Sequence, residues 1–145
     1  MVRFESSTSI ALPVEEVFDF VTDVRNDPKW HTDILEVAEA SGAPVGQGPV
    51  FDIRLKPFMG NSEGTIAVAE LQRPRRAVLK AKLGKMPVTL TYSFEADGAG
   101  TRFTRAVEVA PPGVMGVMAP LMKGMMRKRN AGFLANLKRV MESTG

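Results

Sequence analysis

The sequence contains no cysteine, and it has only one histidine, one tyrosine and one tryptophan among its 145 residues. The absence of cysteine excludes disulfides, a thiolate metal site and a cysteine nucleophile. A single histidine argues against a transition-metal site, which needs several nitrogen or sulfur ligands. We therefore expect neither a bound metal nor a cofactor.

Long apolar runs are also missing. No stretch approaches the roughly 20 apolar residues that a membrane-spanning helix needs, and the first ten residues lack the basic region and apolar run of a signal peptide. Gly42, Gly46 and Gly48 lie between two expected strands, not between a strand and a helix, so they do not form a phosphate-binding loop. The net charge of +3 comes without the interleaved aromatics of a nucleic-acid platform. These features predict a cytoplasmic protein with no nucleic-acid partner.

A chain of this length fits one domain, which we expect to cover residues 1–145. The pattern of Arg3–Ala11 predicts a strand, and Pro13 opens a helix with Glu15 and Glu16 in its first turn. Asn26-Asp27-Pro28 breaks this helix, and a short helical or turn segment with Trp30 follows. Alternating apolar and polar residues then predict consecutive antiparallel strands, over Ile34–Ala40, Val50–Lys56, Thr65–Leu71, Ala77–Leu83, Val88–Ala96 and Arg102–Val109.

The segment from Pro112 to Gly145 is rich in methionine and in positive charge. Alone, such a segment fits a pliable lid over a nonpolar ligand, a partner-binding helix or a helix that touches a membrane. A single sheet needs a cover for its apolar face, and this segment is the only expected helix long enough to supply one. We expect its apolar stripe, with Met118, Met122, Met125 and Met126, to face the sheet.

At this level of detail the sequence resembles the START-like superfamily, also called SRPBCC, which includes the polyketide cyclase/dehydrase and lipid-transport group and is related to the birch-pollen allergen fold. The likeness extends over essentially the whole chain. It rests on Phe4–Ala11 with Pro13–Phe18, on Asp27–Trp30, on Glu70–Arg76, and on Pro112-Gly113, Pro120-Leu121 and Phe133–Lys138.

The resemblance implies an α+β helix-grip fold, in which a curved antiparallel sheet of six to seven strands wraps around a long C-terminal helix. Two short helices would follow the first strand. It also implies an internal cavity for a hydrophobic molecule such as a lipid, quinone or polyketide. Two functions fit: a binder or transporter of that molecule, and a cyclase/dehydrase-type enzyme for an aromatic or poly-β-keto substrate. A monomer, a homodimer and a transient membrane contact are all compatible with this interpretation.

Arg105 shares its strand face with Phe103, Val107 and Val109, so a regular strand would point it toward the apolar interior. A buried cation is costly unless it is paired or hydrogen-bonded. Arg105 could hold a carboxylate, phosphate or enolate of a ligand. Alternatively, it pairs with an acid such as Glu63 or Glu70, or a bulge turns it outward.

Tyr92 and His31 are the other candidates for chemistry. The phenol of Tyr92 lies on the expected inner face, where it would contact a ligand or form part of the core with a satisfied hydroxyl. His31 could serve as a general base, although the plainer interpretation is a solvated side chain beside a Trp30 that plugs the core. The expected cavity wall consists of Phe51, Ile53, Leu79, Leu90, Tyr92, Arg105, Met118, Met122, Met126 and Phe133.

Overall fold

The computed structural model describes residues 2–39, 50–58, 60–110 and 119–144. Its elements are β1 (Val2–Ile10), α1 (Val14–Thr22), the 3-10 helix η1 (Val24–Asn26), α2 (Asp27–Trp30), β2 (Ile34–Glu39), β3 (Val50–Phe58), β4 (Asn61–Gln72), β5 (Arg76–Leu83), β6 (Met86–Asp97), β7 (Gly100–Val109) and α3 (Ala119–Thr144). The expected α+β helix-grip fold is confirmed, with seven strands.

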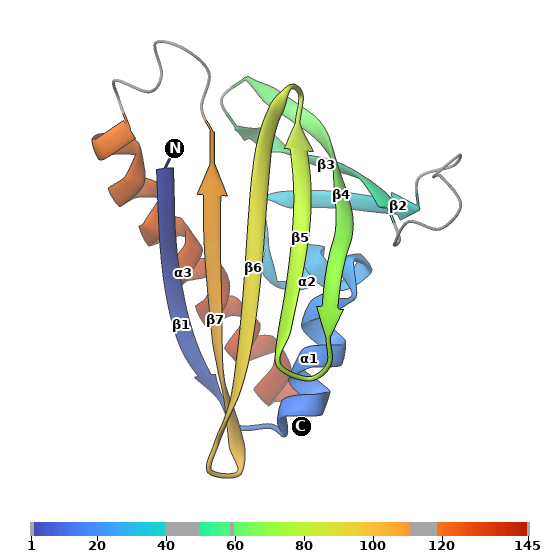
Figure 1. Cartoon of the computed structure of the whole chain (residues 1–145), viewed down its shortest axis with the longest axis vertical. Coiled ribbons are helices and arrows are strands. Elements are labelled where there is room, and N and C mark those ends of the chain that lie inside the picture. Colours follow the sequence, from blue (N-terminus) through green and yellow to red (C-terminus); the bar gives the residue numbers. More distant parts are fainter. Residues whose placement is uncertain (1, 40–49, 59, 111–118, 145) are drawn as a thin grey trace.

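All seven strands belong to one antiparallel sheet in the order β1-β7-β6-β5-β4-β3-β2. Strands β2 to β7 follow one another as a meander, and β1 joins the far edge by pairing with β7. The helices α1 and α2 connect the two edges, and the sheet curves around α3 (Figure 1). The alternation in the sequence therefore places one residue in two on an enclosed inner face.

The helix α3 packs along β1 and also contacts α2. Its buried side chains recur at helical spacing, at Met126, Asn130, Leu134, Leu137 and Met141. This stripe confirms that the helix covers the sheet, because residues three or four apart share one face.

One part of the methionine prediction is wrong. Met125 is 59% exposed, because it lies about 100° around the helix from the buried Met126. Met122 is partly buried against the core, and Met118 lies outside the described residues.

A second correction concerns the expected helix break. The first helix does end before the short helix with Trp30, but the break lies at the extended Asp23, and Asp27 and Pro28 form the first turn of α2. Proline is tolerated there because its missing N–H would have had no partner in a first turn. As a result, Asp27 is buried against the core and not exposed at a loop.

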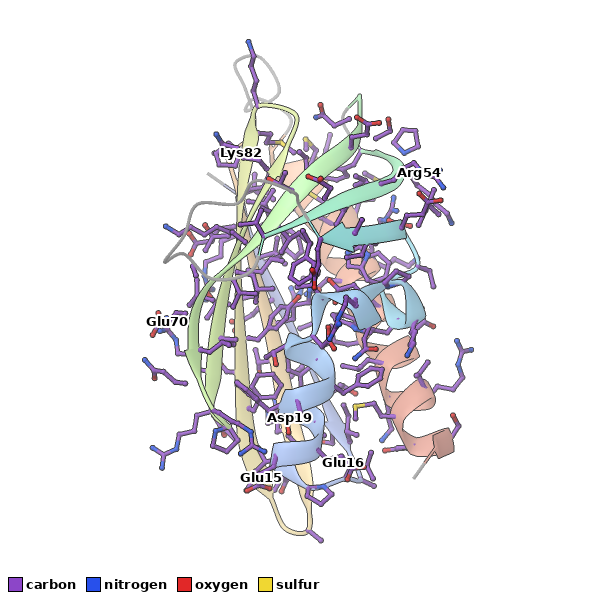
Figure 2. The ribbon with its side chains drawn as sticks, turned by 90° about the vertical axis from the view of Figure 1, so that its right-hand side faces the viewer. Glu15, Glu16, Asp19, Arg54, Glu70 and Lys82 are labelled. Carbon is purple, nitrogen blue, oxygen red and sulfur yellow. The ribbon has the colours of Figure 1, made fainter. Side chains whose placement is uncertain are left out.

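The outer surface is charged. Arg54, Glu70 and Lys82 project from the outside of the sheet, and Glu15, Glu16 and Asp19 from the outside of α1 (Figure 2). In the described part of the chain, no helix is long and apolar enough to cross a membrane.

Candidate functional site

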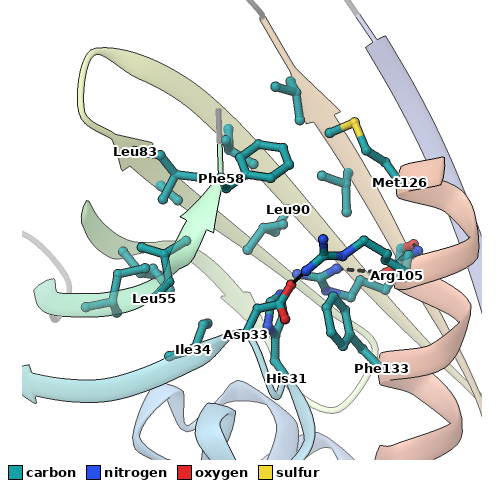
Figure 3. A pocket seen from close by; sticks show the side chains of 18 of the residues that line it. His31, Asp33, Ile34, Leu55, Phe58, Leu83, Leu90, Arg105, Met126 and Phe133 are labelled. Atoms are coloured by element: carbon teal, nitrogen blue, oxygen red, sulfur yellow. Dashed lines mark hydrogen bonds and ion pairs between the residues drawn. The ribbon is translucent and has the colours of Figure 1, made fainter. Parts of the chain in front are cut away.

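A cavity of about 120 Å³ lies between the inner face of the sheet and α3. Its wall is mainly apolar, with side chains from the strands of the sheet and from α3 (Figure 3). The apolar part consists of Phe4, Ile34, Ile53, Leu55, Phe58, Ile66, Ala81, Leu83, Val88, Leu90, Val107, Val109, Met126 and Phe133. The charged or polar part is His31, Asp33, Lys56, Arg105, Arg129 and Asn130.

The cavity occupies only one half of the inner face. In the other half, next to α1, aromatic rings fill the space: Phe18 contacts Phe94, Phe94 stacks on Phe103, and Phe103 meets Tyr92 and Trp30 edge to face. Trp30 is completely buried, as expected of a side chain that closes the core. This aromatic cluster sets the inner limit of the cavity.

Arg105 points inward, as the strand parity predicts, and is only 6% exposed. Its guanidinium lies 5.8 Å from the Trp30 ring and 6.0 Å from the Tyr92 ring, at the boundary between the cluster and the cavity. Its Nη1 donates to Oδ1 of Asn130 at 2.7 Å, and Nδ2 of Asn130 donates back to the carbonyl oxygen of Arg105 at 3.1 Å.

The alternative partners expected for Arg105 are not used. Glu70 pairs with Arg76 on the sheet surface. Among the described residues Arg105 forms no ion pair, and its Nε is buried without a hydrogen-bond partner. The wall of the cavity therefore contains a cation whose partner in α3 is a neutral amide.

Asp27 is a second buried polar group close to this boundary. It is 3% exposed, and its Oδ1 has no hydrogen-bond partner. Burial raises the pKa of Asp27 to about 8, the positive charge of Arg105 lowers it, and the negative charge of Asp23 raises it. Asp27 is therefore largely protonated at neutral pH and supplies little counter-charge to Arg105.

His31 lines the cavity and is half-buried, so it is not the fully solvated side chain of the plainer interpretation. Its ring stacks on Phe133 at 3.9 Å, and its Nδ1 is buried without a partner. Burial holds the pKa of His31 well below its usual range, and the positive charges of Arg105 and Arg129 lower it further. The imidazole is therefore neutral at physiological pH.

Tyr92 belongs to the aromatic cluster and not to the cavity wall. Burial raises its pKa to about 12, although the charge of Arg105 and a hydrogen bond with it act in the opposite direction. A phenol with so high a pKa is a poor proton donor.

An ion pair lies at one side of the cavity. Arg129 of α3 binds Asp33, which lies between α2 and β2. Both side chains line the cavity, and Figure 3 shows Asp33 beside it. Lys56 of β3 is exposed and also lines it. The cavity therefore reaches the surface near these charged residues.

The structure brings together about half of the expected wall. Ile53, Leu90, Arg105, Met126 and Phe133 line the cavity. Phe51, Leu79 and Tyr92 are buried outside it, and Met122 packs against the core without reaching it.

The sequence profile of the family described as polyketide cyclase/dehydrase and lipid transport matches residues 1–142. The chain belongs to this family. Among proteins with curated descriptions, no sequence matches it. The match to the family profile confirms the resemblance that the sequence analysis predicted.

Solved structures show the same fold at low sequence identity. A START superfamily protein from Mycobacterium smegmatis matches with a TM-score of 0.76 at 15% identity, over 99% of both chains. A Thermus thermophilus protein gives a TM-score of 0.74 at 16% identity, also over 99% of both chains. The di-domain ARO/CYC BexL from the BE-7585A biosynthetic pathway gives 0.70 at 16% identity, over 97% of this chain and 48% of BexL.

In this member of the polyketide cyclase/dehydrase and lipid-transport family, sequence reasoning missed Asp27, Asp33, Arg129 and Asn130. Arg129 and Asn130 lie in the positively charged segment from which the sequence predicted only the apolar stripe to face the sheet. One signal was available for Asn130: it is four residues after Met126 and four before Leu134, both on the buried stripe. A polar residue at a core position of a helix indicates a buried hydrogen bond.

A second hollow lies on β2, β3 and β4 and is lined by Glu36, Ala38, Asp52, Ile53, Arg54, Glu63 and Gly64. Most of these side chains are exposed, and Arg54 pairs with Glu36 at 2.8 Å. This surface is mostly charged, whereas the wall of the cavity is mostly apolar. None of its side chains carries a buried unpaired polar atom.

Proposed function

We propose that this protein binds a small hydrophobic molecule in the cavity between its sheet and α3. The observation that carries the proposal is the space inside the apolar wall, which a fully packed core would not leave. Family membership supports it, because the family description includes lipid transport.

The size of the cavity limits the bound part of the molecule. A volume of about 120 Å³ is close to that of a cavity that holds one benzene ring. A larger guest would have to displace wall side chains, of which Met126 is the most adaptable because its thioether chain is unbranched. A body of one or two rings, or a short acyl chain, fits this space best.

Native mass spectrometry of the freshly purified protein, followed by solvent extraction, tests whether a molecule is carried. A thermal-shift panel of fatty acids, quinones, sterols and small aromatics extends the test. A ligand at about one hundred times its Kd adds about 2.7 kcal/mol to the free energy of unfolding, which raises Tm by several degrees. No co-purified molecule and no shift across the panel would contradict the proposal.

A pair of alanine variants locates the binding. Ala81→Leu places extra carbon atoms in the cavity wall, whereas Ala135→Leu makes the same change on the exposed face of α3. We expect Ala81→Leu to abolish the thermal shift and Ala135→Leu to retain it. Equal shifts in both variants would place the ligand elsewhere.

A cyclase/dehydrase activity is the second candidate, and one observation favours it. A neutral imidazole with an unpaired Nδ1 shares the cavity with a buried guanidinium. His31 could accept a proton from a carbon between two carbonyls while Arg105 holds the resulting enolate oxygen. The enolate carbon would then form a bond to a second carbonyl carbon, and the imidazolium of His31 would return its proton to the new alkoxide. The resulting alcohol would then lose water.

A linear triketone is a substrate small enough for a direct test. We expect His31→Gln and Arg105→Gln each to lower turnover by at least about tenfold, and Ala135→Leu to leave it unchanged. The cavity volume ranks this candidate below simple binding, because a long polyketide does not fit without rearrangement. Equal turnover in the wild type and both site variants would rule out this cyclase/dehydrase mechanism.

A further inference from the structure

We propose that the cavity selects an organic anion, because Arg105 is buried in its wall without a counter-charge. Asp27 controls this selection, since it leaves Arg105 without a counter-charge only while it holds a proton. In alkaline solution, binding of the anion therefore draws a proton onto Asp27. This inference rests on the proposed function and adds the ligand class. The ligand is an amphipathic molecule with a ring or short acyl body and a carboxylate, enolate or phenolate end.

The first support is the environment of Arg105. Its guanidinium is buried, its Nε has no partner, and its hydrogen bond across to α3 ends on the neutral amide of Asn130. A buried cation without a counter-charge is unfavourable, and an anion at hydrogen-bond distance relieves this cost. The unpaired Nε–H belongs to a residue of the cavity wall, so a bound oxygen could accept from it.

The second support is the position of Asp27. The charge of Arg105 acts on this buried carboxyl, yet the two side chains do not form an ion pair among the contacts of the described residues. One carboxylate oxygen of Asp27 is buried and unpaired. A buried carboxyl in this state favours the protonated form, because desolvation penalises the charge.

The charged and titratable groups around Asp27 are Asp23, Arg105 and Tyr92. A hydrogen bond from Arg25 lowers the pKa of Asp23, which is ionised at neutral pH and above. Tyr92, with a pKa of about 12, stays neutral in mildly alkaline solution. Of these groups, Asp27 is the one that changes charge between about pH 7 and pH 10.

Anion binding must then depend on pH in one direction. Below about pH 8 Asp27 already carries its proton, and affinity for an anion is constant. Above this pH the free protein loses the proton, and an incoming anion has to restore it. Affinity then falls by up to about tenfold per pH unit until the higher pKa of the liganded state is reached.

Two fluorescent probes with one skeleton test this. Naphthalene-2-sulfonate is an anion at every pH used, and methyl 2-naphthyl sulfone is its neutral counterpart; both have the two-ring body that the cavity fits. We would measure both dissociation constants from about pH 6 to pH 10 for the wild type, Asp27→Asn and Arg105→Gln. Calorimetry in buffers with different ionisation enthalpies would measure proton uptake at about pH 9.

We expect the wild type to prefer the sulfonate, and to lose that preference by about tenfold between about pH 8 and pH 9.5. Asp27→Asn should keep the preference at all pH values and take up no proton. Arg105→Gln should show no preference for the sulfonate at any pH. The affinity for the neutral probe should not depend on pH in any of the three proteins. Ala81→Leu should weaken both probes, which locates them in the cavity.

The outcomes separate this inference from the function on which it rests. A neutral probe that binds at least as tightly as the sulfonate would overturn the inference and leave the binding function intact. The inference would also be overturned if the affinity of the wild type for the sulfonate did not change with pH. The same holds if Asp27→Asn showed the same pH dependence as the wild type. Binding of neither probe, with no ligand found in the thermal-shift panel, would overturn both.

Discussion

Arg105 and Asn130 bind each other in both directions across the space between β7 and α3. The guanidinium donates to the amide oxygen at 2.7 Å, and the amide nitrogen donates to the backbone carbonyl of Arg105 at 3.1 Å. Both side chains are buried. The pair therefore fixes α3 against the sheet at the point where the cavity begins.

Removal of the Asn130 side chain should be costly. Asn130→Ala leaves a buried guanidinium with fewer partners, and such a loss typically costs about 2 kcal/mol. We expect the free energy of unfolding to fall by about that amount in urea denaturation. Asn136→Ala is the matched control on the same helix, because the 3.4 Å hydrogen bond from Asn136 to Trp30 is longer and only partly buried; it should cost less than half as much. Equal losses would contradict the role given to Asn130.

Asp27 should make the protein less stable as pH rises. Its pKa of about 8 in the folded state exceeds the ordinary value of 3.8, so the folded state binds a proton that the unfolded chain has released. The contribution of Asp27 to stability therefore falls between about pH 4 and pH 8, by up to about 1.4 kcal/mol per pH unit. We expect Asp27→Asn to match the wild type near the acidic end of this range and to exceed its free energy of unfolding at the alkaline end.

Asp19→Asn is the control for this measurement, because Asp19 is not among the groups whose charge acts on Asp27. The pKa of Asp19 is lowered by its hydrogen bond with Arg73, so its contribution is constant from about pH 5 to pH 8 and is lost only in more acidic solution. The difference between Asp19→Asn and the wild type should therefore be flat over that range. A flat difference for Asp27→Asn as well would show that Asp27 has an ordinary pKa.

His31 should act in the opposite direction. The folded state keeps this imidazole neutral, whereas the unfolded chain binds a proton below about pH 6.5. The contribution of His31 to stability should therefore decrease as pH falls from about 6.5 to 5, so the free energy of unfolding of His31→Gln should rise relative to that of the wild type. Since His31 is the only histidine in the chain, urea denaturation of these two proteins at neutral and at mildly acidic pH isolates its contribution. An unchanged pH dependence in His31→Gln would contradict a buried neutral imidazole.

Strand periodicity predicted which residues face inward, but not which half of the inner face is open. Leu79 shares its face with Ala81, and Tyr92 shares its face with Leu90, yet only Ala81 and Leu90 line the cavity. The difference comes from the aromatic cluster beside α1, which fills one half through contacts between distant segments. A period of two residues carries no information about such packing.

Asp27 was missed for a different reason. An Asp-Pro pair usually marks a turn or a helix start at the surface, and here it does start a helix. The helix is placed against the core, which buries the carboxyl. Only the three-dimensional arrangement of α2 and β7 brings its charge close enough to affect Arg105.

The ion pair between Asp33 and Arg129 should slow the exchange of a bound molecule. It joins the segment before β2 to α3 at the side where the cavity reaches the surface. The Asp33 side chain is 17% exposed and that of Arg129 is 46% exposed, so the pair should contribute less than about 1 kcal/mol to stability. Arg129→Gln should therefore barely change Tm, but should raise the dissociation rate of methyl 2-naphthyl sulfone about threefold in stopped-flow fluorescence.

Arg73→Gln is the matched control for this exchange measurement. It removes a comparable pair with Asp19 on the outer surface, away from the cavity wall, and should leave the dissociation rate unchanged. Addition of salt should raise the wild-type rate toward that of Arg129→Gln, because screening weakens a partly exposed ion pair. Identical rates in both variants and at all salt concentrations would show that the pair between Asp33 and Arg129 does not control access to the cavity.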